Sequence, residues 1–208
     1  LETLDSGTVT VHGEELGSLK KPQLRKLRRK IGMVFQQFNL LESKTVYHNI
    51  ALPLILEKVP KAEIDKKVKE VLRFVELEDK KDVYVSQLSG GQKQRVSLAR
   101  VLALSPPVLL MDEPFAALDA ITREQMQLLL VTLHARIGMG IILVTHDVEE
   151  ALLLGDEVCV MAPGQGIVAS RRVEVPRTGD VADRELLREL KTILRQSMAG
   201  QGGPLLLS

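Results

Sequence analysis

Two adjacent carboxylates follow an apolar run in the stretch MDEPFAALDA. Asp112 and Glu113 come directly after residues 108–111, and His146 comes shortly after a second apolar run, residues 141–144. At such positions one acid can hold a hydrated Mg²⁺, a neighbouring acid can polarise a water, and a histidine can reach a phosphoryl oxygen. Each feature alone is more often structural, so phosphoryl chemistry is at this point one of two interpretations.

A glycine-rich turn, LSGGQ, opens a helical stretch at residues 88–92. Ser89 can cap that helix, and Gly90 and Gly91 allow the backbone to approach a ligand, so the amides and the helix dipole would face an anion. An ordinary capped helix start explains the same residues equally well.

The two apolar runs show no polar alternation and are separated by the helix-like stretch ITREQMQLLLVTLHAR. This pattern is typical of parallel strands that are covered on both faces and joined through a helix. Ligands gather at the carboxyl ends of such strands. The sequence therefore predicts an α/β core with its chemistry at one edge of the sheet.

The remaining chain adds simpler elements. We expect a short antiparallel strand near Val9 and Val11, a buried strand ending at Gln36 and Gln37, and two strands around the 163–166 turn. We also expect a solvated basic helix at 20–30, an amphipathic helix at 61–77, and a final amphipathic helix at 186–194 before a loose tail. The basic helix lacks interleaved aromatic residues, which favours a solvated face over a nucleic-acid patch.

Composition limits the class of protein. The chain has 208 residues, 45% hydrophobic and 26% charged, with a net charge of +1, which is typical of one globular domain. Its single cysteine, Cys159, excludes an internal disulfide and suits a reducing compartment. Apolar stretches such as IALPLIL are too short to span a bilayer, so a membrane role would require a partner.

The ordered motifs together resemble the ATP-binding subunits of ABC transporters. They are VFQQ as the Q-loop, LSGGQKQR as the signature, VLLMDEP as Walker B, ALD as the D-loop and VTHD with the switch histidine. The resemblance implies a P-loop NTPase-like ABC ATPase core: a mainly parallel sheet flanked by helices, an antiparallel β piece and a helical subdomain at about 45–95 that includes the signature. We expect a single domain over 1–208, with 175–208 as C-terminal helix and tail.

By the same resemblance, four residues serve the nucleotide of their own chain. Asp112 and Gln36 would help to hold Mg²⁺. Glu113 would polarise the attacking water, and His146 would contact the γ-phosphate of ATP. Glu113, His146 and Gln36 form the predicted catalytic set.

The signature is expected to act across a dimer. The resemblance implies that Ser89, Gly90 and Gly91 bind the γ-phosphate of the nucleotide on the opposite subunit, and Gln92 and Asp119 complete the predicted ATP-binding set.

The phosphate loop of this family, Gly-x-x-x-x-Gly-Lys-Ser/Thr, cradles phosphates with its amides and lysine and ligates Mg²⁺ through its hydroxyl. The sequence contains no Gly-Lys dipeptide. Because LETLDSGTVTVHGEEL resembles the family's segment after that loop and its helix, we expect the chain to begin just after the motif, without the strand, loop and helix. Such a truncated ABC ATPase domain would expose apolar surface, because a central strand and its covering helix would be missing.

Two subfamilies contribute to the resemblance. RRKIGMVFQQFNLLESKTVYHNIALPL is similar to the methionine importer ATPases, whereas MDEPFAALDAITREQMQLLL and VTHDVEEALLLGDEVCVM are more similar to nitrate, sulfonate and taurine importers. A chimera with its seam between the signature and Walker B is therefore a hypothesis.

The function that the resemblance implies is an ATPase subunit of a bacterial ABC importer, peripheral on the cytoplasmic face of the inner membrane. Its expected partners are transmembrane permease subunits, a second ATPase subunit and, indirectly, a solute-binding protein, with no nucleic acid. Phe38, Leu40 and Leu41 would form the coupling surface, unless they are simply core residues.

A soluble ABC-type ATPase acting on DNA or ribosomes would need a coiled-coil insertion or a second nucleotide domain, and neither is present. A non-catalytic fragment or pseudo-subunit is the remaining alternative, and the missing phosphate loop favours it.

Overall fold

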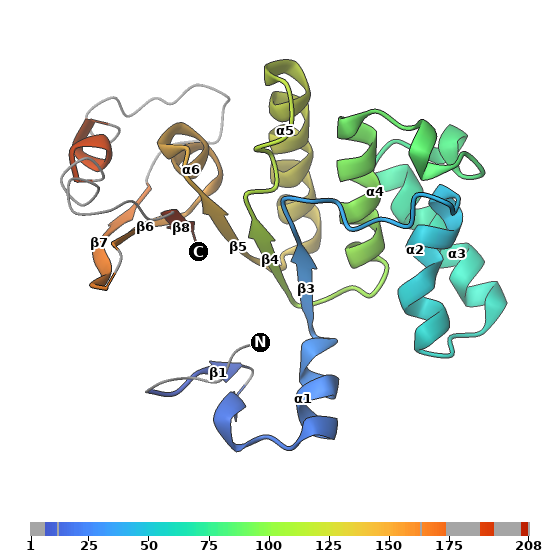
Figure 1. Cartoon of the computed structure of the whole chain (residues 1–208), viewed down its shortest axis with the longest axis horizontal. Coiled ribbons are helices and arrows are strands. Elements are labelled where there is room, and N and C mark those ends of the chain that lie inside the picture. Colours follow the sequence, from blue (N-terminus) through green and yellow to red (C-terminus); the bar gives the residue numbers. More distant parts are fainter. Residues whose placement is uncertain (1–6, 12, 163, 174–187, 194–204, 208) are drawn as a thin grey trace.

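The computed structural model describes residues 7–11, 13–162, 164–173, 188–193 and 205–207. Its centre is a six-stranded sheet in the order β3-β4-β5-β8-β6-β7 (Figure 1). The strands are β3 (Ile31–Val34), β4 (Val108–Asp112), β5 (Gly140–Thr145), β6 (Glu157–Ala162), β7 (Gly166–Arg172) and β8 (Leu205–Leu207). β3, β4 and β5 are parallel, which confirms the predicted α/β core.

Helix α5 (Ala120–Ile137) joins the parallel strands β4 and β5. It begins at Asp119 and ends where Gly138 adopts the left-handed conformation, with φ of 67°, which lets the chain turn back into β5. The short helix α6 (Val148–Leu154) follows β5 in the same way. The predicted strand-helix-strand arrangement is therefore confirmed.

A group of helices lies beside the β3 edge of the sheet (Figure 1). Its members are α2 (Val46–Leu56), α3 (Lys61–Phe74) and α4 (Gly90–Leu102), joined by the single 3-10 turns η2 (Glu78–Lys80) and η3 (Val85–Gln87). The stripe predicted on α3 is confirmed, because Ile64, Val68, Val71, Leu72 and Val75 are all buried. This group covers the region predicted as a helical subdomain, whose limits at 45–95 stay a prediction.

The N-terminal elements also agree with the sequence. A two-stranded antiparallel sheet pairs β1 (Thr10–Val11) with β2 (Glu14–Glu15), and the turn η1 (Leu16–Ser18) follows it. The basic helix α1 (Lys21–Arg28) buries only Leu27, so its charged face is exposed as expected.

Strand β3 differs from the prediction. It ends at Val34 rather than at Gln36 and Gln37, which lie exposed in the loop after it. Val34 is fully buried, but Met33 is 42% exposed, so β3 is not covered on both faces. The Met33 side chain is therefore exposed on one face of β3, whereas Val34 is buried on the other.

The described strands form one continuous sheet, in which β8 takes a central position, and the expected loss of an N-terminal strand stays a prediction. β8 lies between β5 and β6 and is antiparallel to both. Its three leucines belong to the stretch that was predicted to be a loose tail, so that prediction was wrong for residues 205–207. β6 and β7 pair around the 163–166 turn as predicted.

Only part of the predicted final helix can be judged. Residues 188–193 are helical and Leu190 is buried, while Leu186, Leu187 and Leu194 lie outside the described residues. In the part of the chain that the structure describes, no helix has both the length and the apolar character needed to cross a bilayer.

Candidate functional site

The parallel register brings the predicted chemical residues to one edge of the sheet. Val34 pairs with Met111, and Asp112 pairs with Val144. Gln36 follows β3, Asp112 is the last residue of β4, and His146 follows β5. All three therefore lie at the carboxyl edge, where parallel sheets place ligand sites.

Glu113 and His146 are in direct contact. The Glu113 Oε1 atom lies 3.2 Å from the His146 Nδ1 atom, with 27% of the glutamate side chain and 67% of the histidine side chain exposed. The Glu113 amide also donates a 2.9 Å hydrogen bond to the carbonyl oxygen of Val144 on β5. The pair can therefore move a proton or orient a water at a surface that solvent reaches.

The backbone of Glu113 is strained. Its φ is 42°, in the left-handed region that residues other than glycine rarely adopt. Such a conformation costs on the order of 1 kcal/mol or more and is found mainly at functional sites, where the surrounding structure holds it. Here the hydrogen bond to Val144 anchors the Glu113 backbone, and the carboxylate lies against His146.

Asp112 and Gln36 offer the oxygen atoms that a hard cation prefers. Both residues are exposed. Within the described ranges, neither side chain has an ion pair or hydrogen bond, and no group of three or more His, Cys, Asp or Glu residues is arranged to hold a metal. The donors thus fit Mg²⁺ bound through a carboxylate, substrate phosphates and water, rather than a cage made of protein ligands alone.

The LSGGQ turn is a complete helix cap. The Ser89 hydroxyl accepts a 3.3 Å hydrogen bond from the Gln92 amide, and the Gln92 side-chain oxygen accepts a 3.0 Å bond from the Ser89 amide. This reciprocal capping box fixes the start of α4. The cap and ligand interpretations are therefore compatible, since the exposed Ser89 and Gly90 remain open to solvent.

The two glycines of this turn differ in their surroundings. A Cβ atom at Gly91 would lie 2.3 Å from the Thr122 Cγ2 atom, whereas the nearest atom to a Cβ at Gly90 would be 3.9 Å away. Gly91 is therefore required by the packing of α4 against α5. No such packing requires glycine at Gly90, whose role in ligand contact stays a prediction.

Asp119 caps helix α5. Its carboxylate accepts hydrogen bonds from the Thr122 amide at 3.1 Å and the Thr122 hydroxyl at 2.7 Å. The bond from the Thr122 hydroxyl is the main reason why the pKa of Asp119 lies below its ordinary value. Because Thr122 also packs against Gly91, the signature and the D-loop aspartate form one connected group.

The predicted residues thus fall into two groups. Glu113, His146, Asp112 and Gln36 gather at the strand edge, while Ser89, Gly90, Gly91 and Gln92 are connected to Asp119. No hydrogen bond or ion pair that the structure describes joins one group to the other.

Arg100 is a positioning residue that the sequence did not reveal. From α4, its guanidinium donates to the carbonyl oxygens of Asn39 at 2.6 Å and Phe38 at 3.2 Å. It therefore holds the loop that follows Gln36, and burial lowers its pKa. The only signal in the sequence was an arginine beside the inward-facing positions of α4.

The predicted coupling residues have mixed exposure. Leu41 is 44% exposed, whereas Phe38 and Leu40 are half-buried and Leu40 packs against the core. The buried Asn49 side chain fixes this loop through a 2.7 Å bond from the Leu41 amide. Core packing therefore explains Leu40 better than Leu41.

A second acidic pair stabilises the segment after His146. Asp147 caps α6 by accepting from the Glu149 and Glu150 amides. The Glu150 side chain is buried and accepts a 3.0 Å bond from Gln127. Burial raises the pKa of Glu150, and the bonds to it from Thr145 and Gln127 oppose that rise.

The model of one protein family, described as ABC transporter, matches residues 1–116. The chain belongs to the ABC transporter family. The match includes the Q-loop, the signature and both Walker B acids.

Curated relatives include methionine import ATP-binding proteins MetN. That of Photorhabdus laumondii is 50% identical over 165 residues, covering 79% of this chain and 48% of the relative. That of Pasteurella multocida is 51% identical over 165 residues, with the same coverage. The chain spans about half the length of the curated relatives it matches.

Solved structures confirm the fold. cbiO1 of Clostridium perfringens, described as part of the ABC transporter complex cbiONQ, has a TM-score of 0.77 and 32% identity over 92% of this chain and 74% of its own. The ATP-binding cassette MJ0796, a dimer bound to ADP and Pi, has a TM-score of 0.71 and 36% identity over 83% of this chain and 75% of its own. The predicted ABC ATPase fold is therefore confirmed.

Proposed function

We propose that this chain is the ATP-binding subunit of a bacterial ABC importer and that the strand edge is its own half of an ATP site. The contact between Glu113 and His146, beside the free oxygens of Asp112 and Gln36, is the observation that carries the proposal. Membership of the ABC transporter family supports it.

Each residue at the edge has a role that its position supports. Asp112 and Gln36 would help to hold Mg²⁺, which would supply positive charge to neutralise the phosphates. Glu113 orients the attacking water, and its strained backbone keeps the carboxylate in place. His146 donates to a γ-phosphate oxygen, with its ring positioned by the Glu113 carboxylate.

The signature acts on the nucleotide of a second ATPase subunit. Ser89 and Gly90 are exposed, and no described bond ties them to the strand edge of their own chain. The capping box occupies the amides of Ser89 and Gln92 and fixes the start of α4, so the amides of Gly90 and Gly91 are oriented before a phosphate arrives. The dimeric state of the MJ0796 neighbour supports an arrangement in which two chains complete each other's sites.

The 208-residue sequence contains no Gly-Lys dipeptide. We therefore propose that a polypeptide of these residues alone neither cradles ATP phosphates nor hydrolyses ATP. In this state it can still donate its signature. A non-catalytic module that binds no nucleotide is the alternative supported by the same observation.

The transported solute is proposed to be methionine or a related amino acid, because the curated relatives are methionine import proteins. An alignment of 165 of the 208 residues includes both sides of the suspected seam. Nitrate, sulfonate or taurine transport and a chimeric origin stay hypotheses. The proposed partners are permease subunits, through which the chain would lie at the cytoplasmic face of the membrane.

Signature donation can be tested with a methionine import protein such as that of Escherichia coli O157:H7, which is 48% identical over 165 residues. A variant of that relative with its own signature serine replaced by arginine should be inactive as a homodimer. Adding this chain should restore ATP hydrolysis, and adding its Ser89→Arg variant should not. Mixed dimers, verified by native mass spectrometry, that hydrolyse no ATP would contradict the proposal.

A further inference from the structure

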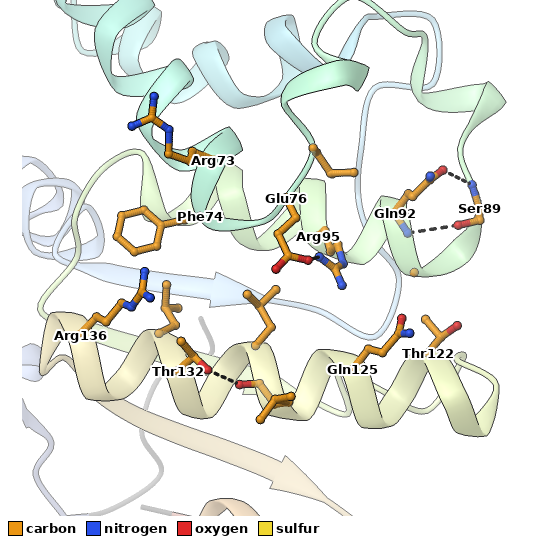
Figure 2. A pocket seen from close by; sticks show the side chains of 15 residues that line it. Arg73, Phe74, Glu76, Ser89, Gln92, Arg95, Thr122, Gln125, Thr132 and Arg136 are labelled. Atoms are coloured by element: carbon orange, nitrogen blue, oxygen red, sulfur yellow. Dashed lines mark hydrogen bonds and ion pairs between the residues drawn. The ribbon is translucent and has the colours of Figure 1, made fainter.

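A recessed groove lies between helices α3 and α5, apart from the strand edge. Its volume is about 490 Å³, and its lining consists of Lys66, Lys69, Glu70, Arg73, Phe74 and Arg136. Figure 2 shows the Phe74 ring between Arg73 and Arg136 of α5, with the Arg73 guanidinium directed away from α5. Arg73, Phe74 and Arg136 also line a larger groove of about 710 Å³, which extends to Ser89 and Gln92.

The lining of the smaller groove is strongly cationic, which is unusual for a chain whose net charge is only +1. Lys66, Lys69 and Arg73 are spaced along one face of α3, and Arg136 lies on α5. None of these four cations has an acidic partner among the described residues. The one acid in the lining, Glu70, is 3.5 Å from a different cation, Lys67.

Like charges at this spacing repel one another by a few tenths of a kcal/mol per pair, and the single carboxylate of Glu70 offsets only part of that repulsion. Elsewhere in the same groove system, the structure pairs its charges: Arg95 lies 2.8 Å from Glu76 and also donates to the Val75 carbonyl oxygen. The unpaired cations therefore mark one end of the groove and not the whole of it. An anionic partner would relieve their repulsion.

Phe74 gives this end an apolar surface. Its ring is half-buried, and the Arg136 guanidinium lies 6.0 Å from the ring centre. That distance is at the limit of a cation-π contact, so it orders the guanidinium without neutralising its charge. The groove thus combines separate cations with an exposed portion of an aromatic ring.

We propose that this groove docks an acidic polypeptide segment that also carries apolar side chains. Lys66 and Arg73 are seven positions apart, about 10 Å along the helix, which suits several carboxylates better than one phosphate. A recess between two helices does not match a flat lipid surface. Phe74 alone does not provide the series of stacked aromatic rings on which single-stranded nucleic acid binds.

Fluorescence anisotropy with the full chain tests the proposal. The probe is a fluorescein-labelled peptide in which glutamate alternates with leucine and serine. The test variant is Lys69→Glu/Arg73→Glu. The matched control is Lys21→Glu/Arg25→Glu, which reverses two exposed cations on α1 that have no ion pair among the described residues. Circular dichroism and thermal unfolding establish that both variants are folded.

The groove variant should bind the peptide about tenfold more weakly than the native chain, and the α1 variant should change the affinity less than twofold. Affinity should also fall as salt is added. The proposal is overturned if the native chain does not bind the peptide or if both variants lose affinity equally. It is also overturned if phosphatidylserine vesicles or single-stranded DNA bind through Lys69 and Arg73 more tightly than the peptide does.

Discussion

Gly91→Ala tests the close packing of α4 on α5. The added Cβ would lie 2.3 Å from the Thr122 Cγ2 atom, so the two helices or the threonine must move. Overpacking of this kind costs about 1 to 3 kcal/mol, and the better helix propensity of alanine returns up to about 1 kcal/mol. We expect a net loss of about 1 to 2 kcal/mol in the free energy of unfolding, measured by urea denaturation.

Gly90→Ala is the matched control. Its Cβ would have no neighbour closer than 3.9 Å, so the alanine should leave stability unchanged or raise it by up to about 1 kcal/mol. A second variant identifies the clashing group. Thr122→Ser removes the Cγ2 atom and keeps the hydroxyl that donates to Asp119. In the Gly91→Ala/Thr122→Ser double variant, most of the lost stability should return.

Two results would refute this reasoning. The first is a Gly91→Ala variant as stable as Gly90→Ala, because the clash would then be absorbed without cost. The second is strict additivity of Gly91→Ala and Thr122→Ser, because residues in contact should show an interaction energy of about 0.5 kcal/mol or more.

Three further changes have defined outcomes. Because burial raises the pKa of Glu150 above its ordinary value of 4.5, the free energy of unfolding should fall as the pH rises through the folded-state pKa. Glu150→Gln should remove that fall, so the urea midpoint near about pH 7, taken relative to that near about pH 4, should be higher in the variant than in the native chain; an unchanged relative midpoint would contradict this. Arg100→Ala should cost about 1 to 3 kcal/mol and speed hydrogen exchange at Asn39, and unaltered exchange there would show that the guanidinium does not hold the loop. Leu206→Pro removes a backbone donor from the strand between β5 and β6 and should lower stability by about 1 to 2 kcal/mol, whereas full stability would mean that β8 contributes little.

Local patterns predicted most of the elements. The apolar spacing on α3 predicted a buried stripe, and all five of its members are buried. The uninterrupted apolar runs before Asp112 and His146 predicted parallel strands, and parallel register alone then requires the residues after them to share an edge. That register brings Glu113 and His146 to the same edge of the sheet, where their side chains are in contact.

Features that depend on distant parts of the chain could not be predicted. β8 forms because β5 and β6 run parallel with one strand position between them, an arrangement that the local sequence of three leucines does not reveal. The packing of Gly91 on Thr122 and the bond from Arg100 to Asn39 also join segments far apart in sequence. The exposure of Met33 depends on what covers the sheet, which strand periodicity does not report.

Calorimetric titration with Mg·ATP tests most directly whether the strand edge belongs to an ATP site. Two proteins are compared: the 208-residue polypeptide, and the same polypeptide with the phosphate-binding segment of the Escherichia coli relative joined before Leu1. We predict no binding by the first. We predict micromolar binding by the second, about −8 kcal/mol, with ATP hydrolysis that Glu113→Gln abolishes while binding persists. Micromolar binding by the 208-residue polypeptide itself, or hydrolysis that survives Glu113→Gln, would contradict the roles assigned to these residues.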